Sequence, residues 1–251
     1  MAMMPGSLLF LGCVLAALFV TMGIYAAAGR RPDADQRSKG GQLFGGAGDF
    51  LLHWFMWVLG PMERVSLALR LTPDVFNYAG LLLGLLSGFL IGTGWLVLGG
   101  WAIALCGVAD IMDGRIARAT GMPSDYGDFI DSTFDRYVEA AAFIGFAYYQ
   151  RHHPWGPLLA GAAMAGSLIV SYVRARGEVL GVKCTGGLMQ RGERLMLTCL
   201  ICLLAPGLAV LFHVQAGLLV RWVLAVIALG TAITAVHRTV WIAQRLRKSP
   251  A

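Results

Sequence analysis

The sequence predicts an all-α integral membrane protein, and three features lead to this class: composition, the length of the apolar runs and the distribution of charge. Of the 251 residues, 57% are hydrophobic and only 14% are charged, whereas a soluble domain carries about 25% charged residues. A bilayer core about 30 Å thick is crossed by roughly 20 apolar residues of helix. Such runs lie at 7–28, 75–97, 99–118, 128–149, 155–175, 195–212 and 217–241.

The first apolar run predicts an additional N-terminal transmembrane helix within residues 1–30. No Lys or Arg precedes it, and the basic residues follow it within 30–39. This is the pattern of a retained span with its N-terminus outside, although the small residues at 25–29 leave a cleaved signal peptide as the alternative. Residues 31–48 are then a cytoplasmic linker.

The next segment, residues 49–71, differs from the spans. It is rich in Trp, Phe and Leu, but Pro61 interrupts it and Glu63, Arg64 and Arg70 charge it. These features predict an N-terminal interfacial amphipathic helix. The six later runs form a six-helix transmembrane core at 72–245, and residues 246–251 are a cytoplasmic tail.

The basic residues predict how the chain is oriented. With the N-terminus outside, only Arg151 and Arg221 among the 20 Lys and Arg residues lie on the outer side. This positive-inside distribution predicts a cell (inner) membrane protein whose polar chemistry faces the cytoplasm. It also explains the net charge of +6 by topology, so no nucleic-acid partner is expected.

Acidic residues gather where the second and third of these six spans meet. Asp110 and Asp113 are three residues apart at the end of one span, and Asp131 and Asp135 are four apart in the next. Spacings of three and four place side chains on one helical face. A short turn at Gly121 joins the two helices antiparallel, so the two carboxylate pairs are expected to face each other.

Four carboxylates at membrane depth cost a few kcal/mol each, and one or two divalent cations would offset that cost. Oxygen ligands without His or Cys favour Mg²⁺ or Mn²⁺. Gly114, Ala117 and Gly127 are small enough to let the helices approach closely and to leave room for a bulky ligand. Arg118 is placed to pair with a carboxylate or a phosphate.

These positions form the run Asp110-x2-Asp113-Gly114-x2-Ala117-Arg118-x8-Gly127-x3-Asp131-x3-Asp135. The run resembles the signature of the CDP-alcohol phosphotransferases, and eight defined positions in one short window make it specific. The resemblance extends over roughly residues 49–245. Asn77 departs from the pattern, because many members have Thr there, near the cytidine end of the site.

The resemblance implies two divalent cations that hold the diphosphate of a CDP-alcohol such as CDP-diacylglycerol. An acceptor hydroxyl then attacks the β-phosphorus and CMP leaves. It implies a homodimer and a general-base or ligand role for Asp135. It also implies a metal site of Asp110, Asp113, Asp131 and Asp135, and a nucleotide site of Asp110, Asp113, Gly114, Ala117, Arg118 and Gly127.

A second polar set bears on the acceptor. Ser171, Arg174, Arg194 and Arg238 resemble the acceptor site of the phosphatidylinositol phosphate synthase branch, with Arg174 where Lys is common. Arginine suits a phosphorylated acceptor because its planar fork contacts two phosphate oxygens. Inositol phosphate is favoured over glycerol 3-phosphate, and serine comes third.

Other charged residues of the chain have simpler interpretations. Arg176 and Arg191 are interpreted as ordinary helix-end cations, and Glu139 as a buried partner of Arg136 or a Tyr. The alternative from another class is a cation- or proton-coupled transporter, since acids within membranes often mark ion paths. The acidic residues here gather at one face of the membrane, and the two halves of the sequence show no internal repeat. Both observations favour an enzyme over a transporter.

Overall fold

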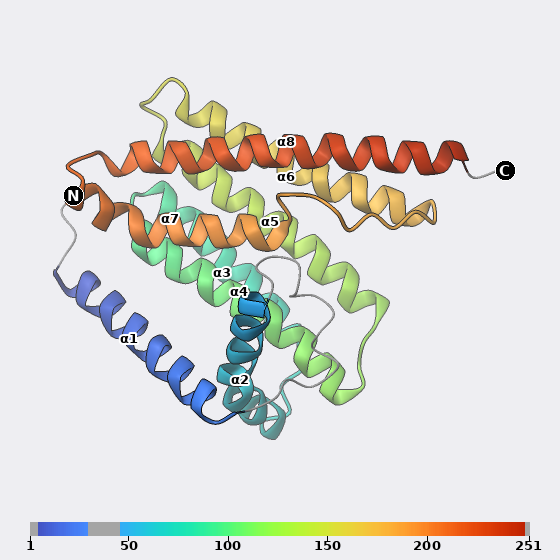
Figure 1. Cartoon of the computed structure of the whole chain (residues 1–251), viewed down its shortest axis with the longest axis horizontal. Coiled ribbons are helices and arrows are strands. Elements are labelled where there is room, and N and C mark those ends of the chain that lie inside the picture. The colour runs from blue at the N-terminus through green and yellow to red at the C-terminus, as the bar shows by residue number, and fades with distance from the viewer. Residues whose placement is uncertain (1–4, 30–45, 249–251) are drawn as a thin grey trace.

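The computed structural model describes residues 5–29 and 46–248, and within them every regular element is a helix. The predicted all-α class is therefore confirmed for this part of the chain. The helices are α1 (Pro5–Ala27), α2 (Gly46–Ala68), α3 (Pro73–Gly92), α4 (Leu96–Thr120), α5 (Asp125–Tyr149), α6 (Gly156–Val179), α7 (Arg191–Leu211) and α8 (Ala216–Lys248). Figure 1 shows their arrangement.

Five of these helices, α3, α4, α6, α7 and α8, are long and apolar enough to cross a bilayer. The chain is thus an integral membrane protein. The apolar stretch Ala16–Ala27 in the described part of α1 is shorter than a span. Most of the predicted linker at 31–48 lies outside the described residues, so it stays a prediction.

Helix α5 is as long as its neighbours but carries the acidic residues, with Asp125 and Asp128 in its first turn. On average, the residues of α5 are therefore less hydrophobic than those of the five apolar helices. A six-span core requires α5 to cross the membrane with its polar face covered by protein. This arrangement stays a prediction.

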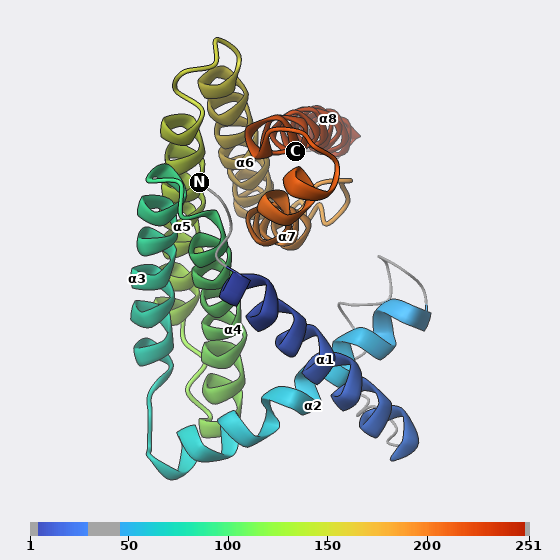
Figure 2. The same cartoon turned by 90° about the vertical axis from the view of Figure 1, so that its left-hand side faces the viewer.

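Helices α3 to α8 form one bundle, in which α3 packs on α4 and α5, and α6 and α7 both pack on α8 (Figures 1 and 2). The backbones of α3 and α5 lie close together at Gly88 and Gly145, where a side chain on Gly145 would collide with the Gly88 carbonyl oxygen. Small residues at a membrane helix contact permit such backbone packing. One apolar cluster spans all six helices and includes Ile91, Ile103, Phe146, Ala160, Cys202 and Leu224.

Helix α2 lies across the base of α4, on the opposite side of the bundle from α8 (Figures 1 and 2). Leu59 packs with Met112 and Ile116 of α4. On the same side, the Arg115 guanidinium donates to Glu63 and, over 2.8 Å, to the carbonyl oxygen of Met56. These contacts fix the amphipathic helix directly beneath the acidic end of α4.

Helix α1 packs on α2 through aromatic residues. The Tyr25 ring lies 5.8 Å from that of Trp57, and the Trp54 Nε1–H donates to the Thr21 hydroxyl over 3.3 Å. Like α2, α1 lies away from α6, α7 and α8 in both views (Figures 1 and 2). Helix α1 is thus attached to α2.

The turn between α4 and α5 determines how the acids of the two helices meet. Gly121 caps α4 with a φ of 67°, in the left-handed region that glycine adopts without strain. Ser124 caps α5, because its hydroxyl accepts from the Gly127 N–H over 3.1 Å. Only four residues separate the helices, so the C-terminal end of α4 lies beside the N-terminal half of α5.

Candidate active site

The structure brings three of the four predicted carboxylates together. Oxygen atoms of Asp110, Asp131 and Asp135 all lie within 4.8 Å of one another. Asp110 comes from α4, and the other two lie one turn apart on α5. Asp113 is also buried, but it lies outside this group, and its Oδ1 accepts a hydrogen bond from the Gly114 N–H.

The three-carboxylate group fits a divalent cation. Two ligands of one Mg²⁺ lie at most about 4.2 Å apart, because each lies about 2.1 Å from the ion. Oxygens within 4.8 Å of one another converge on one ion after small side-chain rotations. All three are hard, charged oxygen donors, the type that Mg²⁺ and Mn²⁺ prefer.

The carboxylates face a pocket between α3, α4, α5 and α7. Phe76, Asn77 and Gly80 of α3 form one wall. Asn77, the position that departs from the family pattern, is therefore part of the same pocket as Asp110 and Asp131. Its amide adds a neutral hydrogen-bonding group beside the acids.

Arg191 contacts the carboxylates directly, although its position at a helix start suggested an ordinary cation. Its Nη1 donates to Asp110 over 2.9 Å, and its Nη2 pairs with Asp135. Arg191 does begin α7, as interpreted, but its contacts with two of the clustered carboxylates go beyond those of an ordinary helix-end cation. A signal was present in the sequence, because Arg191 and Arg194 are three residues apart and so share one face of α7.

The predicted nucleotide-binding positions lie at the end of α4 and the beginning of α5. The Arg118 guanidinium extends over Gly114, where an added Cβ would lie 3.3 Å from Nη1. Gly127 lies one turn before Asp131 and joins the Ser124 cap. With Ala117, these residues lie outside the lining of the carboxylate pocket, toward the turn.

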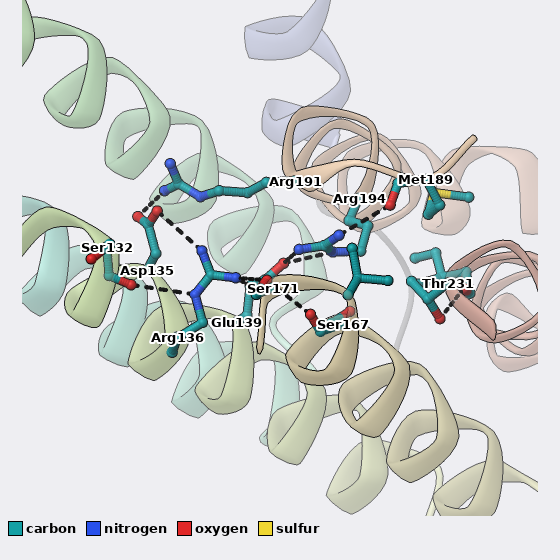
Figure 3. Close-up of polar contacts among 12 residues, drawn as sticks. Ser132, Asp135, Arg136, Glu139, Ser167, Ser171, Met189, Arg191, Arg194 and Thr231 are labelled. Atoms are coloured by element: carbon teal, nitrogen blue, oxygen red, sulfur yellow. Dashed lines mark hydrogen bonds and ion pairs between the residues drawn. The ribbon is translucent and has the colours of Figure 1, made fainter. Parts of the chain in front are cut away.

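Arg136 connects the carboxylate pocket to α6. Its Nη2 lies 3.5 Å from Asp135 Oδ2, and its Nη1 lies 3.3 Å from Glu139 Oε2 and also donates to the Ser171 hydroxyl. Figure 3 shows the Arg136 and Arg191 guanidinium groups both reaching Asp135. Ser171, predicted at the acceptor site, is thus one hydrogen bond away from the residue that contacts Asp135.

Arg194 lies deeper in the protein and is only 2% exposed. Its Nε and Nη2 contact Glu139 Oε1 over 2.7 and 2.6 Å, and its Nη1 donates to the Met189 carbonyl oxygen over 3.1 Å (Figure 3). Glu139 is therefore a buried partner of Arg136, as expected, and also of Arg194, which was not foreseen.

The other two predicted acceptor residues have different surroundings. Arg238 is buried, and its guanidinium donates to the carbonyl oxygens of Gly186 and Val170 over 2.8 and 3.2 Å. It thereby ties the connection between α6 and α7 to α8. Arg174 is exposed and pairs with Glu178 over 3.0 Å. The structure thus places Ser171 and Arg194 in the network around Glu139, and Arg238 and Arg174 beside it.

Comparison with known families assigns this constellation. The profile described as CDP-alcohol phosphatidyltransferase matches residues 70–234, from the connection between α2 and α3 into α8. This range covers most of the chain and contains the whole carboxylate group. The chain belongs to the CDP-alcohol phosphatidyltransferase family. As a member, it is an enzyme of phospholipid biosynthesis, and the transporter alternative is excluded.

Within this family, the chain is similar to inositol phosphate-type synthases. It is 33% identical over 198 residues to the phosphatidylinositol phosphate synthase of Cutibacterium acnes, covering 73% of this chain and 91% of that one. It is 31% identical to the archaetidylinositol phosphate synthase of Methanothermobacter thermautotrophicus, covering 74% and 90%.

Solved structures of one such phosphatidyltransferase have the same fold. The Mycobacterium tuberculosis phosphatidylinositol phosphate synthase PgsA1, in complex with manganese and citrate, superposes with a TM-score of 0.62 at 28% identity, covering 72% of this chain and 87% of that one. Its structure with CDP-DAG bound gives 0.61 at 28% identity, covering 72% and 92%.

Proposed function

We propose that this phosphatidyltransferase is a phosphatidylinositol phosphate synthase. It transfers the phosphatidyl group of CDP-diacylglycerol to a hydroxyl of inositol phosphate and releases CMP. The observation that carries this proposal is the continuity between the carboxylate group and three arginines, Arg191, Arg136 and Arg194. A phosphorylated acceptor needs cations next to the place where its hydroxyl reacts.

The binding site for the donor, CDP-diacylglycerol, is assigned to α4 and α5, which carry the signature residues. Asp110, Asp131 and Asp135 would hold the first divalent cation, Mg²⁺ or Mn²⁺, and buried Asp113 is the candidate to complete a second site. Bound cations would neutralise the diphosphate and stabilise the departing CMP. Small residues and an arginine at the α4–α5 turn would accommodate the nucleotide, namely Gly114, Ala117, Arg118 and Gly127.

The chemical step is assigned to Asp135. In this scheme the acceptor oxygen forms a bond to the β-phosphorus, the bond from that phosphorus to the CMP oxygen breaks, and Asp135 takes the hydroxyl proton. Arg191 and Arg136 contact the Asp135 carboxylate from two sides. Arg191, which pairs with Asp135 directly, would hold this carboxylate in a fixed orientation. Arg136, 3.5 Å from it, would lie close to the anionic group of the acceptor.

The acceptor side is assigned to Ser171, Arg174, Arg194 and Arg238, with Arg191 added by the geometry. Ser171 and Arg174 lie on α6, Arg191 and Arg194 on α7, and Arg238 on α8. The names of the curated relatives support an inositol phosphate acceptor. Glycerol 3-phosphate, which also carries a phosphate, is the second candidate.

We further propose the arrangement in the membrane. The catalytic core at 72–245 crosses six times, the helix at 49–71 lies in the interface, and the segment 1–30 adds one span with its N-terminus outside. The excess of Lys and Arg at the catalytic end supports a cytoplasmic active site. A homodimer is expected from family membership.

The proposal is tested by measuring CMP release. The protein is purified in detergent and supplied with Mg²⁺ or Mn²⁺ and CDP-diacylglycerol, together with inositol phosphate, glycerol 3-phosphate, serine or inositol. We expect metal-dependent CMP release with inositol phosphate and with none of the other three acceptors. Release only with glycerol 3-phosphate would reassign the acceptor, and release with none of the four would overturn the proposal.

A further inference from the structure

Glu139 is a charged side chain in an apolar part of the bundle. It is 7% exposed and lines a second pocket, beyond the carboxylate group, together with Ile103, Val138, Ala142, Phe143, Arg194, Leu195 and Thr198. A carboxylate at such a place is costly unless its charge is compensated. The residues that contact Glu139 should therefore explain why a charged side chain lies there.

The two oxygens of Glu139 hold two different arginines. Oε1 accepts from Nε and Nη2 of Arg194 over 2.7 and 2.6 Å, and Oε2 pairs with Nη1 of Arg136 over 3.3 Å. Arg136 is one turn away on α5, whereas Arg194 comes from α7. Glu139 is thus the common anion of two cations on separate helices.

Arg136 continues toward the active site, and Arg194 continues toward the connection between α6 and α7. Arg136 reaches Asp135 on one side and the Ser171 hydroxyl on the other, and Arg194 holds the Met189 carbonyl oxygen at the end of the α6–α7 connection. Figure 3 shows Glu139 between the two guanidinium groups. Removal of the Glu139 charge therefore takes a shared counter-ion from two arginines at once, without altering any of the clustered carboxylates.

We propose that Glu139 is the positioning residue of the acceptor site, which orients Arg136 and Arg194 for a phosphorylated acceptor. This inference rests on the proposed function of the same site. Glu139 acts through the arginines and does not contact the reacting atoms, so its loss changes acceptor affinity much more than the rate of the chemical step. Arg136 thereby becomes an acceptor-side residue, which the sequence pattern had not assigned.

The experiment is a comparison of Glu139→Gln, Glu139→Asp and the wild type in the CMP-release assay, with the phosphorylated acceptor that the wild type uses. For Glu139→Gln we expect the acceptor KM to rise about tenfold or more, with the CDP-diacylglycerol KM and kcat within about threefold. Glu139→Asp keeps the charge and should recover part of the acceptor affinity.

Glu63→Gln is the matched control. It removes a carboxylate that is also partly buried and also pairs with an arginine, but it lies on α2, on the other side of α4. We expect this variant to leave the acceptor KM within about twofold of the wild type. Thermal unfolding of all variants in detergent shows how much stability each loses.

The outcomes separate the inference from the proposed function. An unchanged acceptor KM in Glu139→Gln, or an equal rise in both KM values, would overturn the positioning role. If Glu139→Gln does not fold, Glu139→Asp decides. Its carboxylate is one methylene shorter and is not expected to hold both arginines in place, so a wild-type acceptor KM in that variant would likewise overturn the inference. Absence of CMP release by the wild type concerns the proposed function instead. In that case the same comparison is made on inositol phosphate binding by calorimetry, where wild-type affinity in Glu139→Gln overturns the inference.

Discussion

The carboxylate group and the arginines around Glu139 lie at the same end of the bundle, but they are neutralised in different ways. Asp110, Asp131 and Asp135 gather three like charges, with Arg191 as the cation that bridges two of them. Arg194 has both an internal counter-ion and a backbone acceptor. The first region has an excess of negative charge and suits a cation, whereas in the second one buried carboxylate, Glu139, is shared by two guanidinium groups.

This difference predicts which region serves function and which also serves folding. Neutralising one of several clustered carboxylates removes repulsion and leaves no charge without a partner. Removing one member of the Arg194–Glu139 pair leaves the other charge buried without its main partner. Variants of the two regions should therefore separate loss of activity from loss of stability.

The largest expected effect is that of Asp131→Asn on turnover. Loss of a metal ligand removes several kcal/mol of transition-state stabilisation, which corresponds to about a thousandfold or more in the rate of CMP release. Thermal unfolding in detergent should occur at the wild-type temperature or above it. Near-normal turnover would show that Asp131 is not a metal ligand. It would also remove the expected difference in activity loss between the two regions.

The second effect is that of Arg194→Met on stability. Since Glu139 then lies buried without its main partner, the free energy of unfolding should fall by about 3–5 kcal/mol. Denaturation in mixed detergent measures this loss. The double variant Arg194→Met with Glu139→Leu removes both charges and should recover most of it. Wild-type stability in the single variant would contradict the buried pair.

An intermediate effect is expected for Glu63→Gln. The Arg115–Glu63 pair is partly buried, with side chains 15% and 20% exposed, and Arg115 keeps its bond to the Met56 carbonyl oxygen. We expect a loss of about 1–2 kcal/mol in the free energy of unfolding. Protease sensitivity of the α2 segment provides a second measurement. If the free energy of unfolding falls as much as in Arg194→Met, depth of burial does not determine how strongly these ion pairs stabilise the protein.

The smallest effect is expected for Glu178→Gln. Its partner Arg174 is 46% exposed and Glu178 is 39% exposed, and exposed pairs contribute about 1 kcal/mol or less. The free energy of unfolding should change by about 0.5 kcal/mol at most. A larger change would show that this pair is part of the buried network.

The carboxylate group was predictable because its geometry is local. Spacings of three and four residues determine which helical face carries Asp110, Asp131 and Asp135, and a four-residue turn leaves the two helices antiparallel neighbours. Arg191 was missed because its partners are distant in sequence. Asp110 lies 81 residues before it, and only the packing of α7 against α4 brings the two together.

The ends of the helices were also only partly predictable from the sequence. The last apolar run was predicted at 217–241, but α8 continues to Lys248. Hydropathy marks the part of a helix that lies in lipid, whereas the helix itself continues into water. Arg245, Arg247 and Lys248 in the last turn also interact favourably with its dipole. The conformation of the α6–α7 connection, held by Arg194 and Arg238, left no periodic signal in the sequence.

The contact between Gly88 and Gly145 constrains how this chain can vary. A side chain on either residue meets the backbone of the facing helix, Ala141 in one direction and Gly88 in the other. Enlarging one position therefore cannot be compensated by a change at the other, since no smaller residue exists. A library randomised at both positions should return glycine at each of them independently. Such positions are coupled in space, yet comparison of many sequences would reveal no covariation between them.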